Sequence, residues 1–393
     1  MARQALAALG TSIFPEMTRL AVERGAVNLS QGFPDFDGPP EIVDAAVTAL
    51  KAGHNQYGRS MGLPALVEQI AAHQRRCWGI EVDPLTEVCA FAGATEGIAA
   101  AMIGLLEAGD EVVLFEPYYD GYPATVAMAG ATARVVTLRA PAFRVEESAL
   151  RAALSPRTRM IVVNSPHNPT GRVLSVEELD VIARVCVERD LVALTDEVYE
   201  HLVFAGARHV PLATRPGMRE RTVALSSTGK TFSFTGWKVG WATGPAPLIA
   251  GVQRAHQFLT FCAATPLHAA MATALERFQQ SFFTSLLAEY TARRDFLVDA
   301  LRAAGFSPIV PEGTYFVLCD LCGLTDEDDV TFARRLIDEA GVAAIPPSVF
   351  YTHAKEEGRR LLRFAFCKRE QTLDEAARRL RAWHASRPRE RAT

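Results

Sequence analysis

The chain has 393 residues, of which 49% are hydrophobic and 22% charged, and its formal net charge is −4. Because this length exceeds the size at which one hydrophobic core stops growing, we expect two domains of unequal size. The nearly balanced charge offers no electrostatic footprint for nucleic acid or an anionic membrane, so small-molecule chemistry is the better expectation. The N-terminal residues do not resemble a secretory signal, and we expect a cytoplasmic protein.

From about residue 40 to residue 245, short apolar runs alternate with helical patterns, which is typical of βα units in a mostly parallel sheet. An apolar stripe indicates the first helix: Ile42, Ala46, Ala49 and Leu50. Ser175 and Glu178 predict a capping box at the start of a later helix, and Gly53 and Gly109 stand where helices are expected to stop.

Four aliphatic runs predict strands of this sheet: EVVLF (111–115), MIVVN (160–164), LVALTD (191–196) and TVALSS (222–227). In open α/β sheets, ligands bind beyond the carboxyl ends of the strands. We therefore expect one edge of the sheet to gather the polar residues that follow these strands: Tyr119, Asn168, Asp196 and Lys230.

After residue 275 the pattern changes to long helices, such as 325–340, and strands within GTYFVLCDL (313–321) and LLRFAF (361–366). This mixture is typical of a smaller α+β domain. We predict a large domain over residues 41–275, a small domain over 276–393, and an N-terminal segment over 1–40 that joins the small domain.

The seven cysteines are scattered through the chain, unlike the framework of a secreted disulfide scaffold, so we expect reduced thiols. Cys319 and Cys322 form a CxxC, but no second CxxC or paired histidine follows. The apolar residues around Cys319 indicate a buried strand, and we predict no metal site.

Lys230 lies in ALSSTGKT (224–231), which nearly satisfies the P-loop pattern with alanine in place of the opening glycine. A P-loop needs a helix that begins at the lysine, whereas the following FSFTGW (232–237) is aromatic and contains glycine. A P-loop NTPase is therefore a remote alternative. The other interpretation is an amine nucleophile, whose pKa is lowered by partial burial and by cations such as Lys238.

Nine short segments carry a more specific signal, because they occur in one order along nearly the whole chain. They are QGFPDF (31–36), NQYG (55–58), GATEGI (93–98), EPYYDGY (116–122), SPHNPTG (165–171), TDEVYEHLVF (195–204), SSTGKTFSFTGWKVGW (226–241), GTYF (313–316) and LLRFAFCK (361–368). Together they resemble the class I/II aminotransferases of pyridoxal 5′-phosphate (PLP) fold type I. Within this family, the chain resembles the branch that includes the kynurenine/glutamine, methionine and N-succinyldiaminopimelate aminotransferases.

This resemblance implies an α/β fold and PLP as the cofactor, with Lys230 as the amine that forms the imine and later acts as the base. Asp196 would pair with the pyridine nitrogen, since a carboxylate keeps the ring protonated and able to accept electrons from a carbanion. Asn168 and Tyr199 would donate to the phenolic oxygen, and Tyr119 would stack on the ring.

The cofactor's phosphate is expected at the start of a helix near residues 94–97, where free amides and the helix dipole favour an anion. The resemblance assigns this role to Ala94, Thr95 and Glu96, together with Ser227 and Lys238. Many family members have arginine at the position of Lys238. The lysine, shared with the glutamine/kynurenine-like branch, presents a point charge in place of a bidentate fork.

Arg363 alternates with apolar residues in LLRFAF, a pattern that would ordinarily place it on the solvent face of a half-buried strand. The resemblance instead makes it the fork that binds the substrate α-carboxylate, with Asn168 beside the substrate and Gly32 leaving room for the carboxylate. The aromatic residues matched to the side-chain pocket are Phe14, Phe33 and Phe261, for which a place in the core is an equally good interpretation.

The resemblance also implies that Tyr57 reaches the phosphate in the neighbouring subunit, giving a homodimer with shared active sites. Two peptide bonds, Glu116-Pro117 and Asn168-Pro169, correspond to positions that are often cis in the family.

We therefore predict a ping-pong aminotransferase that moves an amino group from a large apolar, aromatic or sulfur-containing L-amino acid to a 2-oxo acid. Two alternatives share the same motifs: an N-succinyldiaminopimelate aminotransferase of lysine biosynthesis and a cysteine-S-conjugate β-lyase. A third, from another class, is a non-catalytic PLP-binding or regulatory module, against which stands the lack of an appended helix-turn-helix segment.

Overall fold

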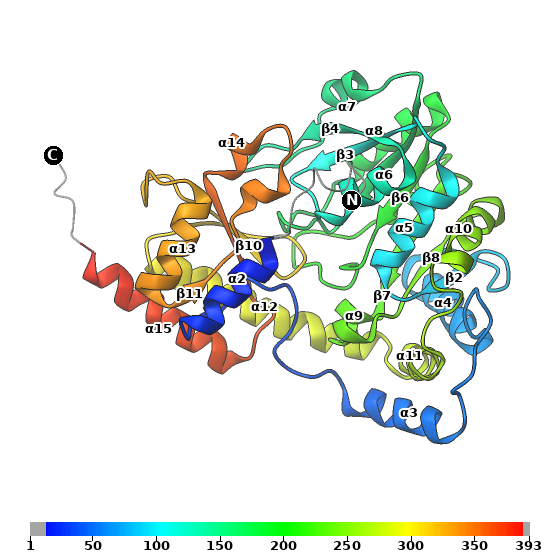
Figure 1. Cartoon of the computed structure of the whole chain (residues 1–393), viewed down its shortest axis with the longest axis horizontal. Helices are drawn as coiled ribbons and strands as arrows, with labels where there is room; N and C mark the ends of the chain where they lie inside the picture. Colours follow the sequence, from blue (N-terminus) through cyan, green and yellow to red (C-terminus); the bar gives the residue numbers. More distant parts are fainter. Residues whose placement is uncertain (1–12, 388–393) are drawn as a thin grey trace, which may run out of the picture.

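The computed structural model describes residues 13–387, and a seven-stranded sheet forms the centre of its larger part (Figure 1). Its order is β2-β8-β7-β6-β5-β3-β4, and β8 alone runs antiparallel to its neighbours. The strands are β2 (Val88–Phe91), β3 (Glu111–Glu116), β4 (Thr132–Thr137), β5 (Thr158–Asn164), β6 (Val192–Asp196), β7 (Thr222–Ser227) and β8 (Gly240–Thr243). The four strands expected from the sequence are confirmed as β3, β5, β6 and β7.

Helices cover both faces of this sheet, which explains why its strands are continuous apolar runs. Val112 and Leu114 of β3 share a core with α5 (Ala94–Leu105), α6 (Gly121–Ala129) and α10 (Ala246–Leu259). Val113 and Phe115, which point to the other face, pack with α7 (Glu147–Ala153) and α8 (Val176–Arg189). The sheet is therefore the middle of three layers.

A further layer beside β2 consists of α3 (Pro40–Lys51), α4 (Pro64–Trp78) and α11 (Thr265–Arg277). Short helical turns complete the larger part: η1 (Leu212–Thr214), α9 (Thr228–Thr231) and η2 (Thr235–Trp237). From there the long helix α12 (Gln280–Ala303) runs toward the C-terminal part of the chain, where it packs against α15 (Glu370–Ser386) (Figure 1).

The C-terminal part is built on a small antiparallel sheet of order β12-β10-β9. Its elements are β9 (Ser307–Ile309), β10 (Phe316–Asp320), α13 (Asp329–Ala340), β11 (Val342–Ala343), η3 (Pro347–Phe350), α14 (Lys355–Gly358) and β12 (Leu361–Ala365). Figure 1 shows α2 (Ile13–Glu23), in blue, among these orange and red elements. The following strand β1 (Val27–Asn28) pairs with β11.

Met17, Ala21 and Leu29, near the N-terminal end of the described residues, share one hydrophobic core with residues of the C-terminal part. Chain ends that are far apart in sequence thus build one small unit. Within residues 13–387, no helix combines the length and apolarity needed to cross a bilayer.

Several local predictions can be compared with the structure. The capping box of Ser175 and Glu178 is confirmed. The predicted helix 325–340 begins later, at Asp329, because the Asp328 side chain accepts a hydrogen bond from the Thr331 amide and caps it there. In the stripe on α3, Leu50 is 49% exposed and was wrongly assigned to the buried face.

Candidate active site

A cavity of about 160 Å³ lies beyond the carboxyl ends of β5, β6 and β7, beside the first turn of α5. Its lining includes most of the residues predicted for cofactor binding: Ala94, Thr95, Tyr119, Asn168, Asp196, Tyr199, Ser227, Lys230 and Lys238. The expectation that polar residues after four different strands meet at one edge of the sheet is therefore confirmed.

Lys230 lies on α9, a single turn that follows β7 and enters the cavity wall. Its Nζ donates hydrogen bonds to the Tyr315 hydroxyl (2.8 Å) and to the carbonyl oxygen of Gly32 (3.2 Å). Burial lowers the pKa of Lys230 to about 8, with Asp196 opposing this shift and Lys238 adding to it. With this pKa about a tenth of the amine is neutral at pH 7, and this fraction can act as a nucleophile and base.

Asp196 ends β6 and is buried against the cavity. Its Oδ2 accepts a hydrogen bond from the Tyr122 hydroxyl (2.6 Å), and its Oδ1 accepts one from the Val198 amide (3.4 Å). Burial raises the pKa of Asp196, while the bond from Tyr122 and the charge of Lys230 act in the opposite direction. Such a carboxylate favours a cationic N–H group as its ligand.

Arg363 on β12 is 1% exposed, so the solvent-facing position suggested by strand alternation is wrong. Its guanidinium donates to Asn168 Oδ1 (2.9 Å) and to the Ser30 carbonyl oxygen (3.3 Å), and its Cζ lies 4.0 Å from the centre of the Phe316 ring. Its Nε has no hydrogen-bond partner among residues 13–387. Burial lowers the pKa of Arg363 to about 10, and a carboxylate ligand would satisfy both its charge and its free donor.

Asn168 is held by one hydrogen bond to its side chain and one from its backbone. Its Oδ1 accepts from Arg363 and its backbone amide donates to Asn164 Oδ1 (2.8 Å), so its amide nitrogen can donate into the cavity. Tyr199 is buried beside it, and burial raises the pKa of its phenol. The two peptide bonds expected as cis, at Pro117 and Pro169, are cis; those at Pro141 and Pro166 are also cis and were not predicted.

The first turn of α5 borders the cavity and could accept an anion, since no side chain caps its N-terminus. Lys238 Nζ lies 3.5 Å from Thr95 Oγ1. A Cβ at Gly93 would come within 2.9 Å of the Lys238 side chain, and a Cβ at Gly240 within 2.5 Å of the Ala94 amide nitrogen. These glycines keep the approach to the helix amides open.

Glu96 is the exception within this predicted set, because its carboxylate does not line the cavity. Instead it accepts hydrogen bonds from the Ala92 amide, the His256 ring and the Thr260 hydroxyl, each at 2.6 Å. Its own amide donates to the Gly93 carbonyl oxygen. Glu96 thus fastens the start of α5 and offers the cavity neither side chain nor free amide.

The predicted aromatic residues of the substrate pocket and the dimer contact do not line the cavity: Tyr57, Phe14, Phe33 and Phe261. Tyr57 is 84% exposed and packs edge-on against Phe261, away from the cavity lining. Phe33 is half exposed beside Lys368, whereas Phe14 lies near Arg363, 5.5 Å from its guanidinium carbon. Of these aromatic residues, only Phe14 contacts the candidate carboxylate-binding group.

Two tyrosines near the centre of the site were missed, although both stand in motifs already recognised in the sequence. Tyr122 closes EPYYDGY and bonds Asp196, and Tyr315 lies in GTYF and bonds Lys230. At Gly32, a Cβ would lie 2.7 Å from the Phe316 ring, so this ring already excludes a side chain at this position.

Comparison with known proteins assigns the class. The family model described as aminotransferase class I and II matches residues 24–380. The chain belongs to this family, whose members use PLP, and it is an aminotransferase of fold type I that acts on amino acids and oxo acids. The P-loop alternative is therefore wrong, in agreement with the four-residue length of α9.

Its relatives place it in the branch that the sequence motifs resembled. A probable N-succinyldiaminopimelate aminotransferase DapC of Mycobacterium tuberculosis is 49% identical over 380 residues, 94% of this chain and 95% of that protein. The methionine aminotransferase of Escherichia coli is 41% identical over 373 residues, 95% of this chain and 96% of that protein. The solved N-succinyldiaminopimelate aminotransferase of M. tuberculosis superposes with a TM-score of 0.94 at 48% identity, covering 98% of this chain and all of that one.

Proposed function

We propose that this aminotransferase binds PLP in the cavity beside α5 and uses Lys230 as both the attachment point and the proton carrier. The observation that carries the proposal is the convergence of Lys230, Asp196 and the free amides of α5 on one cavity. In PLP, the aldehyde would react with Lys230, the ring nitrogen would pair with Asp196, and the phosphate would accept hydrogen bonds from the α5 amides. When bound, PLP supplies an electron sink for a carbanion at the substrate Cα.

The chain's own residues then have separate tasks. Asp196, held by Tyr122, keeps a proton on the ring nitrogen, and Asn168 and Tyr199 donate to the phenolic oxygen. Arg363 binds the substrate α-carboxylate with its Nε, which has no partner in the described part of the chain, and thereby orients the Cα–H bond. When it is not attached to the cofactor, the Lys230 amine moves the Cα proton. It can do so because its lowered pKa leaves part of the amine neutral.

For the amino donor, we propose N-succinyldiaminopimelate first, because the relative with that printed activity is 49% identical over 94% of this chain. A large apolar or sulfur-containing amino acid is the second candidate. It is supported by the methionine aminotransferase at 41% identity and by the aromatic rings of Phe14 and Phe350 within 5.5 Å and 5.0 Å of the Arg363 guanidinium carbon.

The test is a half-reaction screen on the PLP-loaded enzyme, in which each candidate donor is added without an acceptor. The true donor discharges the cofactor's visible absorbance and yields its 2-oxo acid in an amount equal to the enzyme. Continuous release of pyruvate and ammonia from a cysteine S-conjugate would instead support a β-lyase. If no amino acid changes the absorbance, a non-catalytic PLP-binding module replaces this proposal.

We also propose a homodimer, in which Tyr57 completes the phosphate site of the neighbouring subunit. Its support is the surface that Tyr57 shares with other exposed apolar side chains: Phe258 at 86%, Leu259 at 41% and Phe261 at 44% exposure. Apolar groups gathered in this way are typical of a protein interface.

A further inference from the structure

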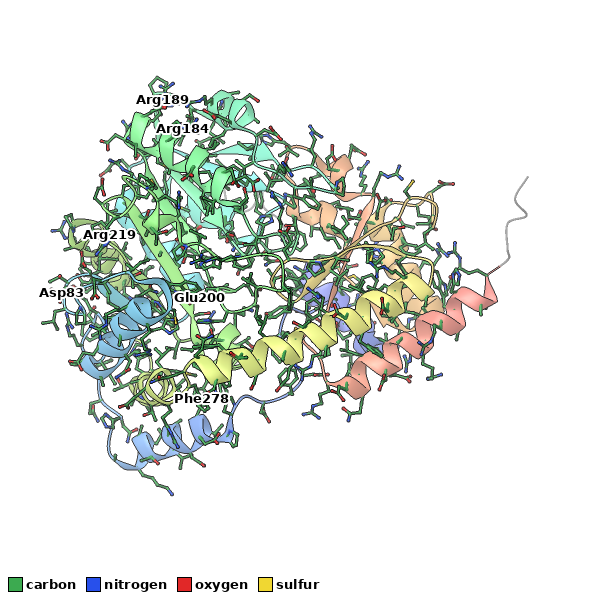
Figure 2. All side chains as sticks on the ribbon, turned by 180° about the vertical axis from the view of Figure 1, so that it is seen from behind. Asp83, Arg184, Arg189, Glu200, Arg219 and Phe278 are labelled. Atoms are coloured by element: carbon green, nitrogen blue, oxygen red, sulfur yellow. The ribbon has the colours of Figure 1, made fainter. Side chains whose placement is uncertain are left out.

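A second cluster of reactive side chains lies outside the cavity, between α4 and the turn that follows β6. His73 and Cys77 stand four residues apart on α4 and therefore project from the same face of the helix. His201 comes from the turn after β6 and brings its Nε2 to 3.2 Å from His73 Nε2. Figure 2 shows the neighbouring Glu200 between α4 and the first turns of α12.

The spacing of these three side chains suits a metal ion. Cys77 Sγ lies 3.6 Å from His73 Nδ1, and one donor atom from each residue can be chosen so that all three lie within 4.8 Å of one another. A tetrahedral zinc ion, with bonds of about 2.0 Å to nitrogen and about 2.3 Å to sulfur, places its donors roughly 3.3 to 3.6 Å apart. The limit of 4.8 Å is wider than this, so the three donors would have to move closer together to bind the ion.

Neighbouring groups hold the cluster in a state that suits a cation. The Glu200 carboxylate is buried, accepts hydrogen bonds from Trp78 (2.6 Å) and Ser226 (2.5 Å), and lies 3.8 Å from His73 Nε2. A carboxylate in this place puts a negative charge beside the three donors, which favours a bound cation.

The two histidines differ in a way that matters for coordination. Burial lowers the pKa of His201 to about 3, so its ring stays neutral and keeps a lone pair. Its ring is stacked on Phe283 with 3.9 Å between centroids and 3° between planes, which fixes its orientation. Burial alone would lower the pKa of His73, but hydrogen bonds to Cys77 and Glu200 raise it to about 9, so its ring must lose a proton before it can coordinate an ion.

An ion can reach the cluster from solvent. Cys77, His201 and Phe283 line a surface cleft of about 820 Å³, and the buried His73 lies next to Cys77 and His201. A fourth coordination position would face this cleft and accept water. The sequence prediction of no metal site considered only Cys319 and Cys322, of which the first is buried and the second exposed.

We propose that His73, Cys77 and His201 form a binding site for a thiophilic divalent cation, of which Zn²⁺ is the best match. Coordination forms one Zn–S and two Zn–N bonds and releases the thiol proton of Cys77 and the imidazolium proton of His73 to solvent. The site is next to the candidate active site in sequence: Glu200 follows Tyr199 directly, and Ser226 precedes Ser227. The ion would cross-link α4 to the turn that carries Tyr199.

The first experiment measures Zn²⁺ binding to the PLP-loaded enzyme by competition with a chromophoric chelator. We expect one zinc ion per chain. Cys77→Ser and His201→Gln should each weaken binding by about 100-fold or more, since even residues that only support ligands contribute about 10- to 100-fold. Cys322→Ser is the matched control, because its thiol is exposed and remote in sequence, and it should bind zinc as the wild type does.

A second measurement needs no variant and so stands even if a substitution impairs folding. Zn²⁺ should slow alkylation of Cys77 in the wild-type holoenzyme at least tenfold, but not that of Cys322, as followed by mass spectrometry. Less than stoichiometric binding, unchanged affinity in both ligand variants, or equal protection of the two thiols would overturn the proposal. If zinc bound at the cofactor instead, binding would persist in Cys77→Ser, and this result would also overturn the proposal.

Discussion

The Tyr122 hydroxyl donates a 2.6 Å hydrogen bond to Oδ2 of Asp196, joining residues 74 positions apart. This bond fixes the carboxylate that faces the cavity and stabilises its ionised form, against the burial that raises its pKa. Tyr122 is 3% exposed, so no water replaces the bond if the hydroxyl is removed. Its contribution to the site can be measured directly.

Tyr122→Phe should weaken PLP binding by about tenfold or more, because a hydrogen bond to a charged group contributes about 1.5–3 kcal/mol. The dissociation constant can be measured by titrating the apoenzyme with PLP and following absorbance. Tyr118→Phe is the matched control, since the Tyr118 hydroxyl bonds Thr352 and not a cavity residue. Equal losses in both variants would assign Tyr122 a merely structural role.

Arg363→Lys should lower kcat/KM for the amino donor by about 100-fold, because an ammonium cannot replace a fork that binds a carboxylate and Asn168 together. Steady-state kinetics with the donor found in the half-reaction screen provide the measurement. Arg360→Lys, at an exposed position just before β12, should behave as the wild type. A variant of Arg363 with unchanged kcat/KM would remove this residue from the substrate site.

Lys230→Ala should abolish amino-group exchange, leaving at most about a thousandth of the wild-type rate, since both attachment and proton transfer use this amine. Single-turnover absorbance after addition of the donor checks this outcome. Lys355→Ala, an exposed lysine on α14, serves as the control. Near wild-type exchange without Lys230 would require a different base.

The capture of PLP by the apoenzyme should depend on pH through Lys230. Because burial lowers the pKa of this amine to about 8, it is protonated below that pH and neutral above it. The capture rate should therefore rise with pH up to about 8 and then level off, as measured by stopped-flow absorbance. A rate still rising steadily toward pH ~10, the ordinary range of lysine, would show that the amine is not shifted.

The proposal that the two subunits share their active sites can be tested with mixed dimers. Tyr57→Ala should weaken PLP retention by about tenfold, as expected for one lost hydrogen bond to a phosphate. When that variant is combined with Lys230→Ala, each mixed dimer contains one site with neither substitution if Tyr57 acts across the interface. Cofactor retention and activity should then return to about half of the wild-type level. Failure to recover would place Tyr57 in its own subunit's site or outside any site.

The sequence by itself predicted the strands of the large sheet, the start of one helix and the edge of the sheet where the site lies. The aliphatic runs predicted β3, β5, β6 and β7, and Ser175 with Glu178 predicted the start of α8. The rule that ligands bind at the carboxyl ends of strands then placed Asp196 and Lys230 at one edge. Motif order identified the family, because nine segments constrain the alignment along nearly the whole chain.

Only the tertiary structure decided which side chains contact one another across the chain. Alternation along β12 misplaced Arg363, because this strand is covered on both sides and period-two reasoning assumes one wet face. Glu96 is hydrogen-bonded to His256, which is 160 residues away, and the His73 ring contacts that of His201, which is 128 residues away. Such pairs leave no local pattern: they exist because packing brings distant helices and strands together, and burial then gives their hydrogen bonds and charges their strength.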